Sequence, residues 1–312
     1  MLYETHKPIF LDDFKIHLNL LPKLQTLCKK DISNILIYGP KGIGKTTIVK
    51  CLLNTHYNTN ILTKNINVMI NSKELKFKSS NYYFEIILNN YYNRKKFEEV
   101  LLYLCEGNDI NNKFKLIIIK NIDMIDELSF KIIKNIIEKR HDSIRFILIA
   151  SNISKLNSFI KGYFLLLRVP FPDKIELLNY IYNIYPNVNH SKINSLIAHT
   201  NNLTDIFISL DIINIDHKYV NPYILASNNL ITLIEGRTIN NIFKIREQLY
   251  NIMSKNYDLK IICNRIYNHF LKSQTNKNGI IELFTKYDYN KITFKDIINI
   301  ESLLINLMNY LY

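Results

Sequence analysis

The chain has 312 residues, of which 47% are apolar and 21% are charged. This composition is typical of a folded protein with two or three domains, and it excludes wholesale disorder. Forty Lys and Arg against 27 Asp and Glu give a formal net charge of +13, which favours a polyanionic partner. A diffuse solubilising charge is the alternative, since the sequence is also rich in Asn and Lys throughout.

The sequence also narrows the cellular setting. No uninterrupted apolar run approaches the roughly 18 residues of a membrane span, so we expect no membrane association. The N-terminus has no basic segment followed by an apolar one, so we expect no secretory signal. The four cysteines are Cys28, Cys51, Cys105 and Cys263. They form no CxxC pair, which predicts small core residues in a reducing compartment and neither a zinc site nor a disulfide framework.

A glycine-rich loop near the N-terminus is the strongest motif. Of seven glycines in the chain, Gly39, Gly42 and Gly44 fall within six residues. The segment matches G-x-x-x-x-G-K-[ST], with a predicted strand over 34–38 before it and a predicted helix over 46–53 after it. A chance match on a Gly/Lys loop is the alternative. We expect the following residues to bind a nucleotide: Gly39, Pro40, Lys41, Gly42, Ile43, Gly44, Lys45, Thr46 and Thr47.

The chemistry of this loop follows from its position at the start of a helix. Backbone N–H groups of the loop point into a phosphate, and the helix N-terminus adds the positive end of its dipole. We expect Lys45 to contact the β- and γ-phosphates and Thr46 to hold Mg²⁺ through its hydroxyl.

Strand and helix signals alternate over the rest of the first half. Apolar periodicity predicts strands over 66–70, 82–88, 114–119, 144–150 and 164–169, and helices over 94–104 and 127–140. The strand over 114–119 is apolar apart from Lys115, as in a central parallel strand. The alternation predicts a parallel sheet in a three-layer α/β domain, with its ligand at the carboxyl ends of the strands.

The pattern changes after Val169. Pro170 and Pro172 end the last strand, and Asp173 is a helix N-cap candidate. Helical signals follow over 174–184, 191–199 and 204–215. Further apolar stripes over 242–253, 261–271 and 297–311 predict packing faces of a wholly helical region. We therefore predict three domains: residues 1–169, 170–224 and 225–312.

This organisation resembles the AAA+ ATPases, and in detail the small subunits of the sliding-clamp loader replication factor C. His6-Lys7-Pro8 stands where that family has a box near the adenine, which implies Lys7 and Pro8 as nucleotide contacts. Residues 38–47 match the family's Walker A segment. Residues 80–86, 168–172, 243–250 and 261–267 resemble the branch called subunit three in animals. The resemblance implies a P-loop AAA+ core, a small helical lid over 170–224 and an all-α collar for oligomerisation over 225–312.

The sequence departs from the family in the residues that hydrolyse ATP. The family's Asp-Glu-Ala-Asp becomes Lys120-Asn121-Ile122-Asp123. A lysine cannot ligate Mg²⁺, and an asparagine cannot act as a carboxylate base. No catalytic residue is assigned with assurance; Asn121 and Asn152, the latter at the family's sensor-1 position, are the candidates.

Two further positions depart from the family. Tyr163 stands at the arginine-finger position and has no guanidinium to stabilise a transferring phosphate. Thr204 stands at the sensor-2 arginine. The resemblance therefore implies a chain that binds ATP or ADP, with Mg²⁺, and hydrolyses it slowly or not at all.

The resemblance also implies partners. These are other clamp-loader subunits in a hetero-oligomer, namely a pentamer, a sliding clamp and primer-template DNA. Helices that track duplex phosphates in the family supply our DNA-binding candidates, with an ordinary solvated face as the alternative for each. They are Arg94, Lys95, Lys96, Lys131 and Lys134. We expect the protein inside the cell at the site of DNA replication, in the nucleus or, for a virus, in a cytoplasmic factory.

Two other functions stay open at this point. An independently active DNA-dependent AAA+ ATPase would need the carboxylates and the arginine finger that are missing. An unrelated P-loop protein, such as a nucleoside kinase, would need an acidic or Arg-rich lid, and no such cluster stands out. The eight histidines form no HExxH pattern, so metallohydrolase chemistry has no support.

Overall fold

A computed structural model describes the chain over residues 5–311, except for 30, 71–72, 90–93, 107–113, 157, 187, 200–201, 216–220, 256, 274–276 and 291–295. The chain folds into two compact units, unit 1 over residues 1–217 and unit 2 over residues 218–312. Within the described residues, no helix has the length and apolar character needed to cross a bilayer.

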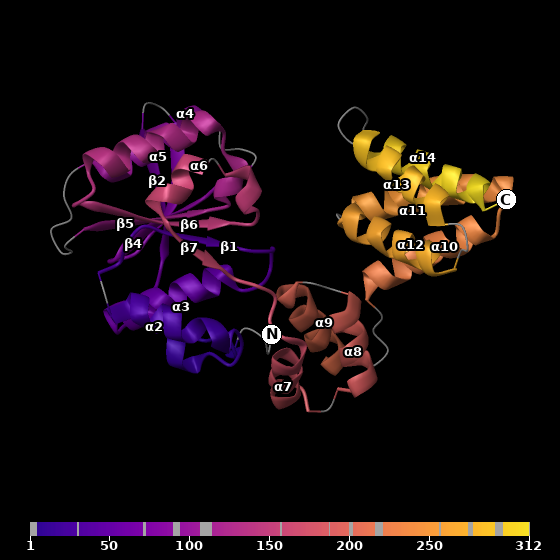
Figure 1. Cartoon of the computed structure of the whole chain (residues 1–312), viewed down its shortest axis with the longest axis horizontal. Coiled ribbons are helices and arrows are strands. Elements are labelled where there is room, and N and C mark those ends of the chain that lie inside the picture. The colour runs from indigo at the N-terminus through magenta and orange to yellow at the C-terminus, as the bar shows by residue number, and fades with distance from the viewer. Residues whose placement is uncertain are drawn as a thin grey trace. The chain divides into compact units, whose positions relative to one another are not determined.

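A seven-stranded sheet forms the centre of unit 1, in the order β2-β3-β4-β5-β6-β1-β7 (Figure 1). Five neighbouring strands, from β4 to β7 in that order, run parallel. This confirms the predicted α/β class. The strands are β1 (Ile35–Tyr38), β2 (Lys64–Ile70), β3 (Lys73–Ser79), β4 (Tyr83–Ile87), β5 (Lys115–Lys120), β6 (Ile144–Ala150) and β7 (Leu165–Arg168).

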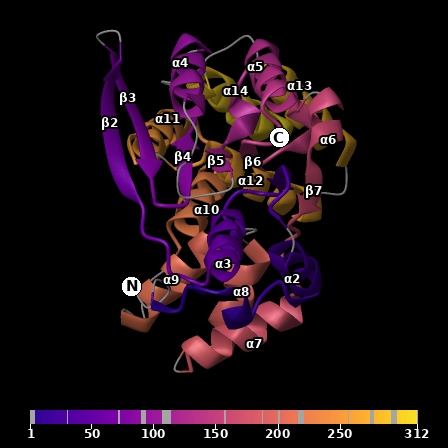
Figure 2. The same ribbon diagram turned by 90° about the vertical axis from the view of Figure 1, so that its left-hand side faces the viewer.

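The predicted parallel sheet continues at one edge into antiparallel strands. β2 pairs antiparallel with β3, and β3 pairs antiparallel with β4. Figure 2 shows β2 and β3 as a long two-stranded ribbon. The sequence of β3 alternates charged and apolar residues, with Phe77 buried between Lys76 and Lys78. That alternation is typical of an antiparallel strand with one solvated face, and it gave a signal that the sequence analysis missed.

Helices cover both faces of the sheet. The helices α2 (Leu21–Lys29) and α3 (Lys45–Tyr57) pack on one face, and α4 (Arg94–Cys105) and α5 (Glu127–Lys139) pack on the other (Figure 1). Central strand β5 serves both layers: Leu116 and Ile118 join the core with α3, whereas its alternate residues join the core with α4 and α5. The remaining short elements are α6 (Ser158–Tyr163) and the 3₁₀ turns η1 (Leu11–Asp13), η2 (Leu18–Leu20), η3 (Ile122–Met124) and η4 (Ile153–Lys155).

Three helices follow β7, as predicted for the lid. They are α7 (Lys174–Ile184), α8 (His190–His199) and α9 (Leu203–Ile215). A buried hydrogen bond of 2.5 Å from the Tyr185 hydroxyl to Asp211 Oδ1 joins the end of α7 to α9. Burial, with the carboxylate next to it, raises the pKa of Tyr185, so the phenol remains a donor at neutral pH.

Unit 2 is a bundle of helices around its own apolar core. The predicted stripes are confirmed as buried faces, for example Ile245 and Leu249 in one helix and Ile266 and Phe270 in another. The helices are α10 (Pro222–Glu235), α11 (Ile239–Ser254), α12 (Leu259–Ser273), α13 (Lys277–Asn290) and α14 (Asp296–Tyr310). The expected boundary at 224/225 falls in the first turn of α10, and the division into three domains stays a prediction.

Candidate nucleotide-binding site

Residues 39–44 connect β1 to α3 in a conformation that requires glycine. Gly39 and Gly42 have φ angles of 154° and 73°, which side-chain-bearing residues rarely adopt. A Cβ on Gly39 would also lie 2.2 Å from the carbonyl oxygen of Val169. The glycines predicted to shape this loop therefore do so through both backbone conformation and close packing.

The side chain of Lys45 lies inside this loop. It is 8% exposed, and its Nζ donates to the carbonyl oxygens of Gly39 and Pro40 at 2.6 Å each. Burial lowers the pKa of Lys45 to about 8, an effect that the Asp123 carboxylate opposes and Lys41 reinforces. The ammonium is thus held by two main-chain carbonyls of the loop, where a phosphate would meet it.

Because the pKa of Lys45 is lowered, we expect phosphate binding to depend on pH. Below pH 8 the ammonium is present and attracts phosphate; as the pH rises through 8 toward 9 the neutral amine replaces it, and affinity falls by up to about tenfold per pH unit. Calorimetric titration with nucleotide at pH 7, 8 and 9 measures this. Lys45→Arg stays charged and should remove the dependence in this range. An affinity of the unmodified chain that is flat from pH 7 to 9 would contradict the assignment.

A cavity of about 890 Å³ opens over the loop, a volume in the range of small-molecule sites. Its wall contains nearly all the residues that the sequence analysis assigned to a nucleotide: Lys7, Pro8, Lys41, Gly42, Ile43, Gly44, Lys45, Thr46 and Thr47. Asn121 also lines it, whereas Gly39 and Pro40 are not in its wall and contact Lys45 through their carbonyl oxygens. The structure brings these residues together; that they bind nucleotide stays a prediction.

The N-terminal segment closes one side of the cavity. Its main chain is fixed to α3 by the Cys51 thiol, which donates to the Pro8 carbonyl at 3.1 Å, and by Asn54 Nδ2, which donates to the Ile9 carbonyl at 2.9 Å. His17 Nε2 lies 3.0 Å from the carbonyl oxygen of Ile43 in the phosphate loop. Burial lowers the pKa of His17, so its neutral ring supports the loop. Sequence reasoning missed His17, because nothing in its neighbourhood indicates a contact 26 residues away.

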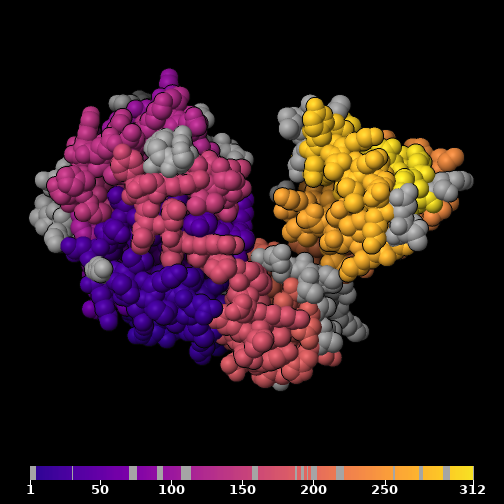
Figure 3. Space-filling view, in the orientation of Figure 1, coloured from indigo at the N-terminus to yellow at the C-terminus, as the bar shows by residue number. Residues whose placement is uncertain are grey.

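The start of α9 lies at the other side of the loop. The Thr204 backbone N–H donates to the Gly42 carbonyl at 3.3 Å, and the Asn202 side chain occupies the space that a Cβ on Gly42 would fill, with Oδ1 1.6 Å from it. Figure 3 shows the surface of the segment after β7, in salmon, directly beside the indigo N-terminal part of unit 1. Thr204, which the resemblance aligned with the sensor-2 arginine, therefore lies at the phosphate loop.

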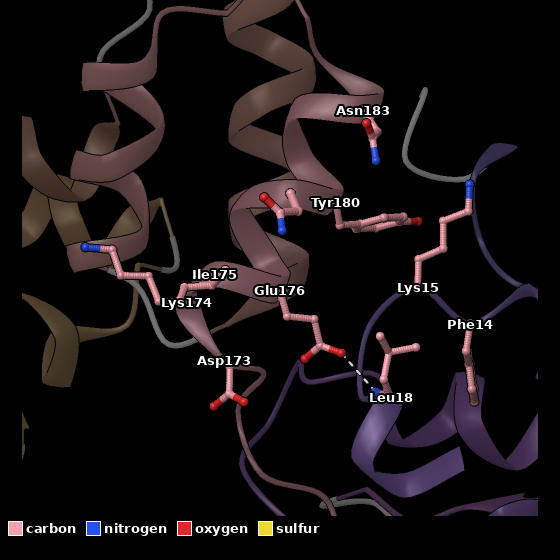
Figure 4. Close-up of a pocket in the computed structure, with 10 residues that line it drawn as sticks. Phe14, Lys15, Leu18, Asp173, Lys174, Ile175, Glu176, Tyr180 and Asn183 are labelled. Atoms are coloured by element: carbon pink, nitrogen blue, oxygen red, sulfur yellow. Dashed lines mark hydrogen bonds between the residues drawn. The ribbon is translucent and has the colours of Figure 1, made fainter. Parts of the chain in front are cut away.

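A second cavity, of about 840 Å³, lies between the N-terminal segment and α7 (Figure 4). Glu176 Oε1 accepts the backbone N–H of Leu18 across it at 2.9 Å. Nearby, the Tyr180 hydroxyl donates to the carbonyl of His6 at 3.0 Å. These bonds tie α7 to the same segment that lines the first cavity.

A buried ion pair includes Lys120, the residue that the resemblance aligns with the family's first magnesium-binding carboxylate. Lys120 Nζ, at the end of β5, lies 2.7 Å from Glu85 Oε1 on neighbouring β4. The Glu85 side chain is 2% exposed and that of Lys120 is 15% exposed, while Lys78 Nζ lies 4.0 Å from the same oxygen. Burial lowers the pKa of Lys120, and Glu85 opposes that shift. The single Glu within the apolar strand Tyr83–Ile87 was the available signal for this partner.

The two catalytic candidates differ in placement. Asn121 has a left-handed backbone with φ of 57° and donates through Nδ2 to the Leu88 carbonyl at 3.0 Å. Asn152 Oδ1 accepts from the backbone and hydroxyl of Ser154 at 3.0 and 2.7 Å, capping the turn η4. Asp123 Oδ1 accepts the backbone N–H of Ser151 at 3.2 Å. Asn121 and Asp123 thus hold main chain that follows neighbouring strands and Asn152 holds its own turn, and the catalytic roles stay predictions.

The DNA-binding candidates lie together on one helical layer. Arg94, Lys95 and Lys96 open α4, and Lys131 and Lys134 project from α5 beside it. Lys131 is exposed. Lys134 Nζ is 3.6 Å from Glu138 Oε1 and 6.0 Å from the centre of the Tyr163 ring. The Tyr163 hydroxyl donates to the same carboxylate at 2.5 Å, so the residue at the arginine-finger position bonds within its own chain.

The chain is similar in sequence to a known protein family and to several known proteins. Residues 35–165 match the model of the ATPase family associated with various cellular activities (AAA). A protein of Acanthamoeba polyphaga mimivirus assigned to the replication factor C small subunits is 28% identical over 99% of this chain and 90% of its own length. Replication factor C subunit 5 of Saccharomyces cerevisiae is 22% identical over 83% of this chain and 84% of its own.

A solved structure supports the fold. A DNA polymerase III gamma subunit-related protein from Thermotoga maritima superposes with a TM-score of 0.52, covering 92% of this chain and 98% of that one at 8% identity. Relatives named subunit 3 and relatives named subunit 5 both match this chain, so the subunit-three branch stays a prediction.

Proposed function

From an AAA ATPase domain over residues 35–165 and a kinship with replication factor C small subunits that spans the chain, we propose that this protein is a nucleotide-binding subunit of a sliding-clamp loader. The observation that carries the proposal is the buried Lys45 ammonium within a glycine-shaped loop, at the floor of a cavity that the lid closes. A loop of this kind binds a phosphate through backbone N–H groups and one lysine.

The ligand of the site is ATP or ADP, and its hydrolysis by this chain is slow or absent. Lys120 replaces the carboxylate that helps hold Mg²⁺ in the family, and Asn121 replaces the one that orients water. Among the described residues of the cavity wall, the Thr46 hydroxyl is the candidate Mg²⁺ ligand and Asp13 is the single carboxylate. The described residues contain no cluster of three His, Cys, Asp or Glu that could hold a metal ion. The donor set therefore fits Mg²⁺ only as an ion carried in on the nucleotide.

The role implies partners and a place of action. The chain acts within a hetero-oligomer of loader subunits, a pentamer, that handles a sliding clamp and primer-template DNA where the genome is replicated, in the nucleus or a cytoplasmic viral factory. Residues 170–224 serve as the lid over the nucleotide, and the collar over 225–312 serves oligomerisation. Its own ATP chemistry is dispensable in this role, because other subunits hydrolyse ATP.

Nucleotide retention and turnover, measured on the purified chain, test this proposal. The chain should hold labelled ATP or ADP through gel filtration and show negligible phosphate release, and it should co-purify with other loader subunits and a ring-shaped clamp. Rapid turnover by the isolated chain, abolished in Lys45→Ala, would instead support an independent DNA-dependent ATPase. Failure to retain any nucleotide would overturn the proposal.

Because the DNA-binding candidates on α4 and α5 are all basic, we expect DNA binding to depend on salt. Binding of primer-template DNA by the assembled loader should weaken steeply with salt, and Lys131→Glu should reduce the logarithmic salt slope by about 0.9 for each phosphate that the variant no longer neutralises. Lys134→Glu should reduce it less, because Glu138 and Tyr163 already engage that ammonium. Lys139→Glu, at the end of the same helix, is the matched control. Unchanged slopes for both variants would remove these lysines from the interface.

A further inference from the structure

The nucleotide cavity is unusually cationic for a site expected to hold a divalent metal. Among the described residues that line it are six lysines and a single carboxylate, Asp13. Asp13 Oδ2 is already engaged, since it accepts the backbone N–H groups of Ile9 and Phe10 at 3.1 and 2.9 Å. A cation entering this cavity would meet like charge and few oxygen ligands, and Mg²⁺ prefers octahedral oxygen ligands with one or two carboxylates.

Two other carboxylates lie close to the cavity but are engaged elsewhere. Glu85 is buried against Lys120, and Asp123 Oδ1 accepts the Ser151 backbone N–H. Neither is among the described residues that line the cavity.

Lys120 is placed to act on an anion. It lies in the cavity wall together with Lys45 and Thr46, at the carboxyl end of the central strand β5, where ligands bind in sheets of this kind. An ammonium has three donors; its one short bond, to Glu85 Oε1 at 2.7 Å, leaves two to point to phosphate oxygens. The Glu85 side chain is 2% exposed and lies on the neighbouring strand. It therefore acts as a positioning residue that holds the Lys120 ammonium.

We propose that Lys120, oriented by Glu85, takes the place of the divalent cation, so that this site binds the polyphosphate of a nucleoside di- or triphosphate without needing Mg²⁺. The inference rests on the proposed function and deepens it. A fixed ammonium supplies positive charge where the metal otherwise would, and its bond to the buried Glu85 carboxylate holds the head group in the cavity wall. Binding then serves to hold nucleotide and not to activate it.

The test is the metal dependence of nucleotide affinity in the full chain. Calorimetric titrations with ATP and with ADP are run in EDTA and in excess Mg²⁺. For the unmodified chain we expect dissociation constants that agree within about threefold between the two conditions. In Glu85→Gln/Lys120→Met, which removes both charges together, we expect affinity in EDTA to fall about tenfold or more and to recover partly on adding Mg²⁺. Lys78→Met, which alters the other lysine near Glu85 but not the cavity wall, should behave as the unmodified chain.

The outcomes separate the two proposals. If the nucleotide affinity of the unmodified chain were more than about tenfold lower in EDTA than in Mg²⁺, this inference would be overturned and the proposed function would stand. In that case, a loss of affinity in Mg²⁺ on the substitution Asp123→Asn would place the metal on that carboxylate. Equal EDTA affinity in the double variant, with an unchanged thermal melt, would also overturn it. No binding in either condition would overturn the proposed function and this inference together. Even if the double variant fails to fold, the EDTA measurement on the unmodified chain still tests whether nucleotide binding needs Mg²⁺.

Discussion

Lys45→Ala is expected to weaken nucleotide binding at least about a hundredfold, close to 3 kcal/mol. The ammonium of Lys45 lies within the glycine loop and is held by two main-chain carbonyls at 2.6 Å. Charge-assisted bonds from such a buried group to phosphate are about twice as strong as neutral ones, and alanine removes all of them. Calorimetric titration with ADP and ATP at pH 7 measures the loss.

Lys41→Ala provides the matched control for that experiment. Lys41 is exposed and lines the same cavity, so its loss should cost far less affinity. Because Lys41 helps to lower the pKa of Lys45, its removal should also move the loss of binding to higher pH. Equal affinity losses in the two variants would show that general positive charge, and not the buried ammonium, attracts the nucleotide.

The second large effect is on stability. Lys120→Ala should lower the free energy of unfolding by about 3–5 kcal/mol, because it leaves a buried Glu85 carboxylate without its close partner. Lys78, the remaining lysine near that oxygen, is 4.0 Å away and 39% exposed, too distant and too well solvated to compensate. Urea denaturation followed by circular dichroism measures the change.

A double variant distinguishes a broken ion pair from a packing defect. In Glu85→Gln/Lys120→Met both charges leave together, and replacing a whole buried pair by neutral groups is often nearly neutral in stability. We therefore expect this variant to recover most of the stability that Lys120→Ala loses. If instead the double variant were as unstable as Lys120→Ala, the Lys120 stem and not its charge would be what stabilises this region.

Local patterns in the sequence were sufficient for the elements that build the nucleotide site. The glycine loop, strand β1 before it and helix α3 after it each carry a short-range signal, so their assembly into a phosphate loop could be predicted. The same holds for β5, whose four buried residues Leu116–Ile119 read as a strand covered on both faces. These elements are confirmed. They could be predicted because the residues within each segment determine its backbone conformation and its burial.

Contacts between distant segments could not be predicted in the same way. The Glu85–Lys120 pair joins residues 35 positions apart on the paired strands β4 and β5. The Ile43–His17 contact joins residues 26 positions apart, and His17 has a left-handed backbone with φ of 64°. Strand β3 was not predicted, although its alternation of charged and apolar residues is a local signal, and its antiparallel pairing with β2 and β4 involves contacts beyond the segment itself. An apolar alternation predicts a strand, but its pairing partner is decided by tertiary packing.

The contact between Gly42 and Asn202 has a consequence for inheritance. A side chain at position 42 would collide with the Asn202 amide, 160 positions later in the chain, before it disturbed any ligand. The two positions therefore constrain each other, because the Asn202 amide that would have to move also accepts the Thr204 backbone N–H and donates to Asp205 at the start of α9. A lineage that replaced Gly42 would strain a backbone with φ of 73° and displace that amide in the same step.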